Sequence, residues 1–135
     1  MASIFSRIAN GEMPCYKVAE TDSFLAFLDI NPLKKGHTLV IPKQETDYIF
    51  DINDQEYQQL FLFAKRVAKA LGKCVPCERV GVAVIGLEVR HAHIHLVPIN
   101  SIYDIDFKKP KMQFQPEEFR ELAEKIGKMI ESVSG

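Results

Sequence analysis

Apolar residues recur every three or four positions in two stretches of the chain, and this spacing predicts two amphipathic helices. The first stretch follows Asn53, a suitable N-cap with Glu56 as its capping-box partner, and its apolar positions run from Tyr57 to Leu71. The second begins at Pro116, which suits the first position of a helix, and continues through most of the remaining chain. We expect each helix to cover a sheet with its apolar face.

Five runs rich in Val, Ile and Phe, bounded by Gly, Pro, Asn or Asp, predict strands. They span residues 16–20, 24–30, 37–42, 79–89 and 91–99. Residues 29–37 predict a loop because Asn31-Pro32 and Gly36 interrupt them, and residues 100–116 predict a long irregular connection because they keep no period. The order of these segments indicates an α+β fold, with a mostly antiparallel five-stranded sheet, a long central helix and a C-terminal helix.

The composition fits one globular domain, which we expect to span residues 1–135. The chain is 47% hydrophobic and 26% charged, with a formal net charge of -1. This balance gives no broad field that would attract nucleic acid or an anionic membrane, so any anion site has to be local. There is no apolar run long enough for a signal peptide or a membrane span, and the three cysteines are an odd number in a chain that can fold without disulfides. We therefore expect a cytoplasmic protein.

Three of the four histidines, His91, His93 and His95, alternate along one predicted strand. Because successive side chains of a strand point to opposite faces, the three imidazoles share one face and the apolar residues between them share the other. An imidazole titrates near neutrality and can donate or accept a hydrogen bond. Such a row suits an anion whose charge changes during a reaction.

Three interpretations of this row stay open on the residues alone. It could be the exposed polar face of an edge strand, or two of its imidazoles could ligate zinc together with His37. In the third interpretation, one imidazole attacks phosphorus and carries the phosphoryl group as a covalent adduct, while the others move protons or donate hydrogen bonds to its oxygens. We favour the third, because the motif contains no cysteine, aspartate or glutamate to complete a metal site, and we predict no metal.

The segment HAHIHLV, residues 91–97, alternates histidine with apolar residues and ends on two apolar residues. In this pattern the chain resembles the histidine triad (HIT) family of nucleotide hydrolases and transferases. Three more segments are similar to the family in the same order: IFSRIANGEMP (residues 4–14), FLAFLDINP (residues 24–32) and GHTLVIPK (residues 36–43). The resemblance covers most of residues 4–98 and implies a HIT-like fold.

The resemblance also implies a role for each matching residue. His93 would be the nucleophile that takes a nucleoside monophosphate onto its imidazole, with His91 and His95 beside the phosphate and His37 completing the polar cluster. Asp29 would accept the ribose hydroxyls. Four apolar residues would enclose the base: Phe5, Ile8, Phe27 and Ile30. On the residues alone, these four could equally belong to a core, and the aspartate could simply start a turn.

The substrate implied by the resemblance is a purine mononucleotide derivative, either a phosphoramidate or a dinucleoside polyphosphate, which is attacked at its α-phosphorus. The motif demands no cofactor. Family members are commonly homodimers that pair through the sheet and the long helix, and we expect the same here, with neither nucleic acid nor membrane as a partner.

The chain departs from the family pattern at a few positions. Many bacterial relatives hold a structural zinc with a C-x-x-C near the N-terminus, whereas this chain has Ser3 and Ser6, so we predict no zinc there. Val80, Leu87 and Glu88 stand where better-characterised branches carry polar residues that touch the phosphate or the leaving group. A nucleotide-binding protein with little or no turnover is therefore the alternative function.

Overall fold

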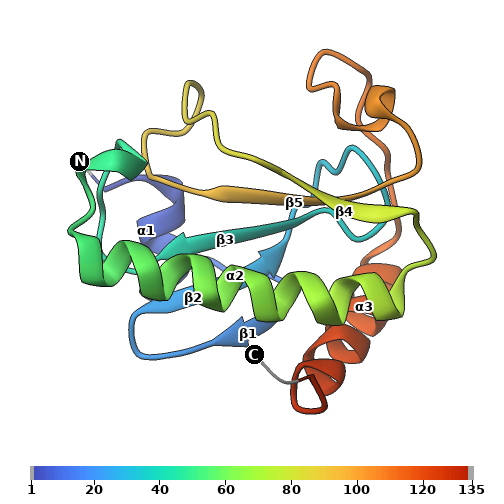
Figure 1. Cartoon of the computed structure of the whole chain (residues 1–135), viewed down its shortest axis with the longest axis horizontal. Helices are drawn as coiled ribbons and strands as arrows, with labels where there is room; N and C mark the ends of the chain where they lie inside the picture. Colours follow the sequence, from blue (N-terminus) through green and yellow to red (C-terminus); the bar gives the residue numbers. More distant parts are fainter. Residues whose placement is uncertain (1, 134–135) are drawn as a thin grey trace.

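A computed structural model of the chain describes residues 2–133 (Figure 1). Its strands are β1 (Lys17–Glu20), β2 (Phe24–Leu28), β3 (Thr38–Pro42), β4 (Arg79–Ala83) and β5 (Ile94–Ile99). Its helices are α1 (Ile4–Ala9), α2 (Asp54–Cys74) and α3 (Pro116–Ile130), with 3-10 turns η1 (Ile49–Asp51) and η2 (Ile102–Ile105). Within the described residues, the strands form one five-stranded sheet in the order β1-β2-β3-β5-β4, and each neighbouring pair is antiparallel. The predicted α+β fold is confirmed.

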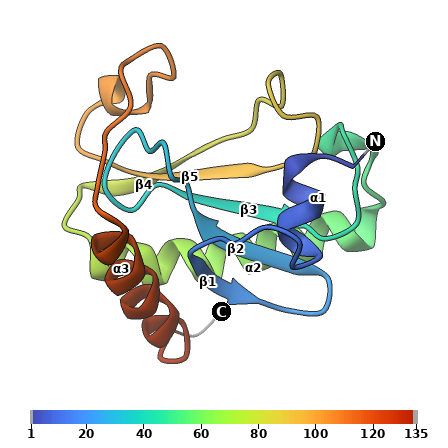
Figure 2. The ribbon, with the colours of Figure 1, turned by 180° about the vertical axis from the view of Figure 1, so that it is seen from behind.

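The central strands β2 and β3 are buried on both faces, which explains why all of their residues except Thr38 are apolar. The larger core cluster joins one face to α2 and α3, and a smaller one, with Leu25, Leu39 and Ile41, joins the other face to α1. The two views of the ribbon show α2 and α1 on opposite sides of the sheet (Figures 1 and 2). On β5, His95 pairs with Leu39 of β3 and so lies on the α1 face.

The two predicted helices begin where the sequence indicates. The Asn53 side chain accepts the N–H of Glu56 at 2.9 Å and caps α2, and Pro116 opens α3. α3 approaches β1 closely at Gly127, where a Cβ atom would lie 2.9 Å from the carbonyl oxygen of Val18. Among residues 2–133, no helix is both long enough and apolar enough to cross a membrane.

Some predicted boundaries were wrong. Residues 91–93 do not belong to a strand, because β5 starts at Ile94, and β4 ends at Ala83 rather than at residue 89. The backbone before β5 pairs elsewhere: the N–H of Ala92 donates to the carbonyl of Thr46 at 2.7 Å, outside the β3–β5 ladder. α1, η1 and η2 were not predicted, because segments of six residues or fewer leave almost no period in the sequence.

Candidate functional site

The four histidines meet on the α1 face, although only His95 lies within a strand. His37 precedes β3, and His91 and His93 lie in the segment that leads into β5. The interpretation of the row as an exposed polar face is wrong, since these residues expose only 1% (His37), 0% (His91), 6% (His93) and 8% (His95) of their surface. Aromatic rings cover two of them: Phe5 contacts His93 with 4.9 Å between ring centroids, and Phe107 contacts His95 with 4.6 Å.

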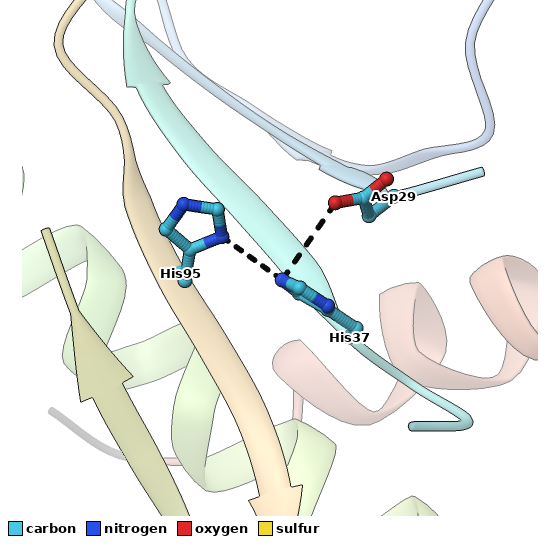
Figure 3. Close-up of side chains that lie close together, drawn as sticks. All are labelled: Asp29, His37 and His95. Carbon is cyan, nitrogen blue, oxygen red and sulfur yellow. Dashed lines mark hydrogen bonds and ion pairs between the residues drawn. The ribbon is translucent and has the colours of Figure 1, made fainter. Parts of the chain in front are cut away.

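Hydrogen bonds assign the proton positions on His37 and His95 (Figure 3). The N–H of Leu33 donates to Nδ1 of His37 at 3.0 Å, so the proton of the neutral ring resides on Nε2. That Nε2 lies 3.0 Å from Nδ1 of His95 and therefore donates to it. His95 must then carry its own proton on Nε2, where it is available to a ligand.

Main-chain carbonyl groups assign the protons of His91 and His93 in the same way. Nε2 of His91 lies 2.8 Å from the carbonyl oxygen of Pro42, and Nδ1 of His93 lies 2.7 Å from that of His91. A carbonyl oxygen can only accept, so both nitrogens are protonated. Nε2 of neutral His93 consequently keeps its lone pair and can act as a nucleophile.

Burial keeps these rings neutral. Burial first, and then nearby positive charge that includes Lys111, lowers the pKa of His37 to about 4 and that of His95 to about 3. Burial also lowers the pKa of His91 and His93, partly offset by their hydrogen bonds to carbonyl groups. At neutral pH the cluster therefore offers lone pairs and N–H groups rather than imidazolium charges.

Asp29 lies just past the end of β2 and faces His37, with 3.7 Å between Oδ2 and Nε2 (Figure 3). Its Oδ1 accepts the N–H of Asn31 at 2.9 Å, so the carboxylate does start the turn that the sequence allowed as an alternative. Burial raises the pKa of Asp29, against the opposing effects of the Asn31 N–H and the charge of Lys111. Oδ2 is the oxygen that makes no such turn contact and remains available to a hydroxyl group.

Asp29, His37 and His95 could also be considered as a metal site, because one ligand atom from each lies within 4.8 Å of the others. The hydrogen bonds argue against this use. A metal on Nε2 of His37 would move the ring proton to Nδ1, where it would face the N–H of Leu33 at 3.0 Å in a buried position. The donor set therefore suits a chain of hydrogen bonds better than a cation.

Three of the four residues predicted to enclose the base come together. Phe5 and Phe27 belong to the smaller core cluster, their ring centroids 5.7 Å apart, and Ile8 packs against that cluster. Ile30 does not join them and is 60% exposed. A separate cavity of about 600 Å³ opens between the β1–β2 turn and the first half of α2, and none of the predicted site residues lines it.

Several groups that contact the histidines or influence their pKa values could not be identified from the sequence. The N–H of Leu33 and the carbonyl of Pro42 are main-chain groups, which side-chain identity does not reveal. Phe107 and Lys111 belong to the aperiodic segment that the sequence predicts as an irregular connection. The Lys111 ammonium donates to the carbonyl of Phe107 at 2.8 Å, which holds a positive charge beside the ring that covers His95.

Comparisons with known proteins agree on one family. A family model described as HIT domain matches residues 10–102. The chain is 36% identical over 136 residues to the adenosine 5'-monophosphoramidase hnt1 of Schizosaccharomyces pombe, covering 96% of this chain and 99% of that protein. It is 36% identical over 135 residues to an uncharacterized HIT-like protein of Borreliella burgdorferi, covering 94% and 97%. A crystal structure of a Hit-like protein from Bartonella henselae matches with a TM-score of 0.82 at 27% identity, covering 94% and 95%.

Proposed function

Because the chain belongs to the histidine triad (HIT) family, we propose that it is a hydrolase or nucleotidyl transferase that acts at the α-phosphate of a nucleotide derivative. One observation carries the proposal: the carbonyl oxygen of His91, 2.7 Å from Nδ1 of His93, accepts a hydrogen bond from its N–H and leaves Nε2 free to attack. The relatives named adenosine 5'-monophosphoramidase, from two yeasts, make an adenosine phosphoramidate the first substrate to test. We also propose that residues 1–135 form a single HIT-like domain.

In the first step of the proposed reaction, Nε2 of His93 bonds to the α-phosphorus, and the bond to the leaving group breaks. The leaving group departs with that electron pair and takes a proton from water. In the adduct the ring is a cationic imidazolium, which the carbonyl of His91 stabilises by accepting a hydrogen bond from its Nδ1–H. In the second step, water attacks the phosphorus and releases its proton, and His93 recovers its lone pair as the nucleoside monophosphate leaves. In the transferase reaction, another acceptor takes the place of water.

His95 is proposed as a hydrogen-bond donor to the phosphoryl oxygens rather than as an acid. Its Nε2 carries the proton, while its Nδ1 is occupied by the N–H of His37. A second proton on His95, placed on Nδ1, would point at the N–H of His37, and two donors cannot hydrogen-bond to each other. His95 is therefore held in its neutral form. A fixed N–H aimed at the developing charge stabilises the transition state without reorganisation.

In the proposed nucleotide complex, the purine lies against Phe5, Ile8 and Phe27, and the ribose hydroxyls bind Oδ2 of Asp29. Because only 6% of His93 is exposed, the aromatic side chains that cover it have to move before a substrate can reach it. Burial of the row is also the observation that favours the second candidate, a nucleotide-binding protein without turnover. Glu88, which is exposed and acidic, supports the same candidate, because it replaces a polar neutral residue of the family pattern.

The deciding experiment is an acid quench with adenosine phosphoramidate labelled at its phosphorus. We expect labelled protein from the wild type and none from His93→Ala, with His91→Asn as a matched variant that leaves the attacking nitrogen in place. Binding of AMP by the wild type, without a labelled adduct and without release of the amine over hours, would instead establish the non-catalytic alternative.

We further propose a homodimer that pairs along β4. This strand lies at an edge of the sheet, with the exposed apolar side chain of Val82 (57% exposed) on it and that of Ile85 (48%) just beyond its end. An edge of this kind is a template for a second copy of the chain. The mass in solution, measured by light scattering, should fall from two chains to one in Val82→Lys, and a monomeric wild type would refute the proposal.

A further inference from the structure

α1 forms one wall beside the proposed nucleophile, although it is too short to be stable alone. It has six residues, and isolated helices of that length are not stable in water. Phe5, near its start, packs edge-on against His93 with 4.9 Å between ring centroids and against Phe27 with 5.7 Å. The position of α1 therefore determines what His93 meets on that side.

The cap of α1 is completed from a distant part of the chain. Ser3 is the N-cap, and its Oγ accepts the N–H of Ser6 at 3.0 Å. In a capping box, the side chain of the third helical residue returns to the N–H of the N-cap. That third residue is Ser6, which does not make this bond. Glu45, 42 positions beyond Ser3, supplies the acceptor instead, and its Oε1 accepts the Ser3 N–H at 2.6 Å.

The same carboxylate oxygen orders the hydroxyl groups that face His91. Oε1 of Glu45 accepts a hydrogen bond from the Ser6 hydroxyl, with 2.7 Å between the oxygens. Because the Ser6 hydroxyl donates there, the Ser3 hydroxyl is the one that donates to Nδ1 of His91, at 2.8 Å. The other nitrogen of His91 already donates to Pro42, so the ring is held on both sides. These bonds connect Glu45, through α1, to the segment whose carbonyl orients His93.

We propose that Glu45 is a positioning residue, which holds α1, and with it Phe5, against His93 by completing the cap of this helix from outside it. Glu45 touches no reacting atom. It is an exposed residue whose carboxylate is ionised at neutral pH, and the Ser3 N–H and then the Ser6 hydroxyl lower its pKa to about 2. The kinetic consequence of this role rests on the proposed function, but the structural consequence does not.

The test compares Glu45→Ala with Glu45→Gln, whose amide oxygen can still accept both hydrogen bonds, and with Glu124→Ala on α3 as a control. The first readout is the nuclear Overhauser effect between the rings of Phe5 and His93 in the ligand-free protein. We expect it to disappear in Glu45→Ala and to persist in the other two variants. The readout needs neither substrate nor turnover, so it remains valid if the proposed hydrolase activity fails.

The second readout is the affinity for AMP. It should fall about fivefold or more in Glu45→Ala, because the variant loses two hydrogen bonds and fivefold corresponds to about 1 kcal/mol, the net value of one of them. With adenosine phosphoramidate, KM should rise more than kcat falls, whereas a purely global loss of stability would leave both constants of the folded protein unchanged. If Glu45→Ala does not fold, Ser6→Ala removes one of the two bonds and provides the same comparison. A retained Overhauser effect together with unchanged AMP affinity would overturn the proposal.

Discussion

Replacing His37 tests the assigned chain of hydrogen bonds, because different side chains restore different parts of it. His37 is 1% exposed and joins two buried partners, the N–H of Leu33 and Nδ1 of His95, each at 3.0 Å. His37→Phe keeps an aromatic ring at this position but forms neither hydrogen bond. His37→Asn places an acceptor near the Leu33 N–H, and His37→Gln places a donor near His95.

The expected cost follows from the two orphaned groups. Each buried unsatisfied polar group costs about 1–3 kcal/mol, so His37→Phe should lower the free energy of unfolding by roughly 2–6 kcal/mol. His37→Asn and His37→Gln should each recover about half of this loss. With a urea dependence of about 2 kcal/mol per molar, the unfolding midpoint of His37→Phe should fall by roughly 1–3 M.

Activity separates the two rescuing variants. Only His37→Gln still donates to Nδ1 of His95 and keeps the His95 proton on Nε2, so its kcat for adenosine phosphoramidate should exceed that of His37→Asn. Urea unfolding and steady-state kinetics at pH 7 measure both quantities. A His37→Phe variant as stable as the wild type, or equal kcat values for the Gln and Asn variants, would refute the assignment of protons made from these hydrogen bonds.

Three further predictions concern the surroundings of the histidines. Gly36 has φ +92°, and a Cβ atom there would lie 3.0 Å from a side-chain atom of α2; Gly36→Ala should therefore cost about 1–2 kcal/mol of backbone strain and about 1–3 kcal/mol of overpacking in urea unfolding. Gly11→Ala, at φ +81° in open space, should show the strain alone. The free energy of unfolding should fall between pH 7 and pH 5, because His37 and His95 protonate at their ordinary pKa of 6.5 in the unfolded chain but only at about 4 and about 3 in the folded chain. The contribution of the two neutral rings to the free energy of unfolding is fully present above pH 6.5 and declines below it by up to about 2.7 kcal/mol per pH unit for the pair. An equal unfolding midpoint at pH 7 and pH 5 would contradict the burial of these rings. Lys111→Met removes a positive charge that lowers the pKa of both rings, so NMR titration should show both pKa values rise, whereas a lysine replaced on α2 should leave them unchanged.

The sequence predicted the architecture because the architecture depends on repeated features. The period of α2 and the apolar strands each involve many residues that favour the same structure, and the Asn53 cap agrees with them. The alternation of histidines also predicted that the imidazoles lie together, but the reason was partly wrong. His95 reaches it from a strand, whereas His91 and His93 reach it from an irregular segment.

What could not be predicted depends on single contacts between distant parts of the chain. Phe107 covers His95 from the aperiodic segment, and Glu45 caps a helix from 42 positions away. Neither contact has a local signature, because each is decided only when the sheet brings the two segments together. The same holds for burial: an alternating pattern tells which residues share a face, but it does not tell which other elements will cover that face.

The groups that fix the imidazole protons of His37, His91 and His93 are all amides of the main chain, supplied by Leu33, Pro42 and His91. The side chains of residues 33 and 42 take no part in these hydrogen bonds, so replacing them does not remove the groups that fix the proton positions. At residue 33 a single replacement is forbidden on these grounds, since proline has no hydrogen to offer. The position of the lone pair on His93 is thus set by the path of the main chain, and side-chain changes that keep this path leave Nε2 unprotonated.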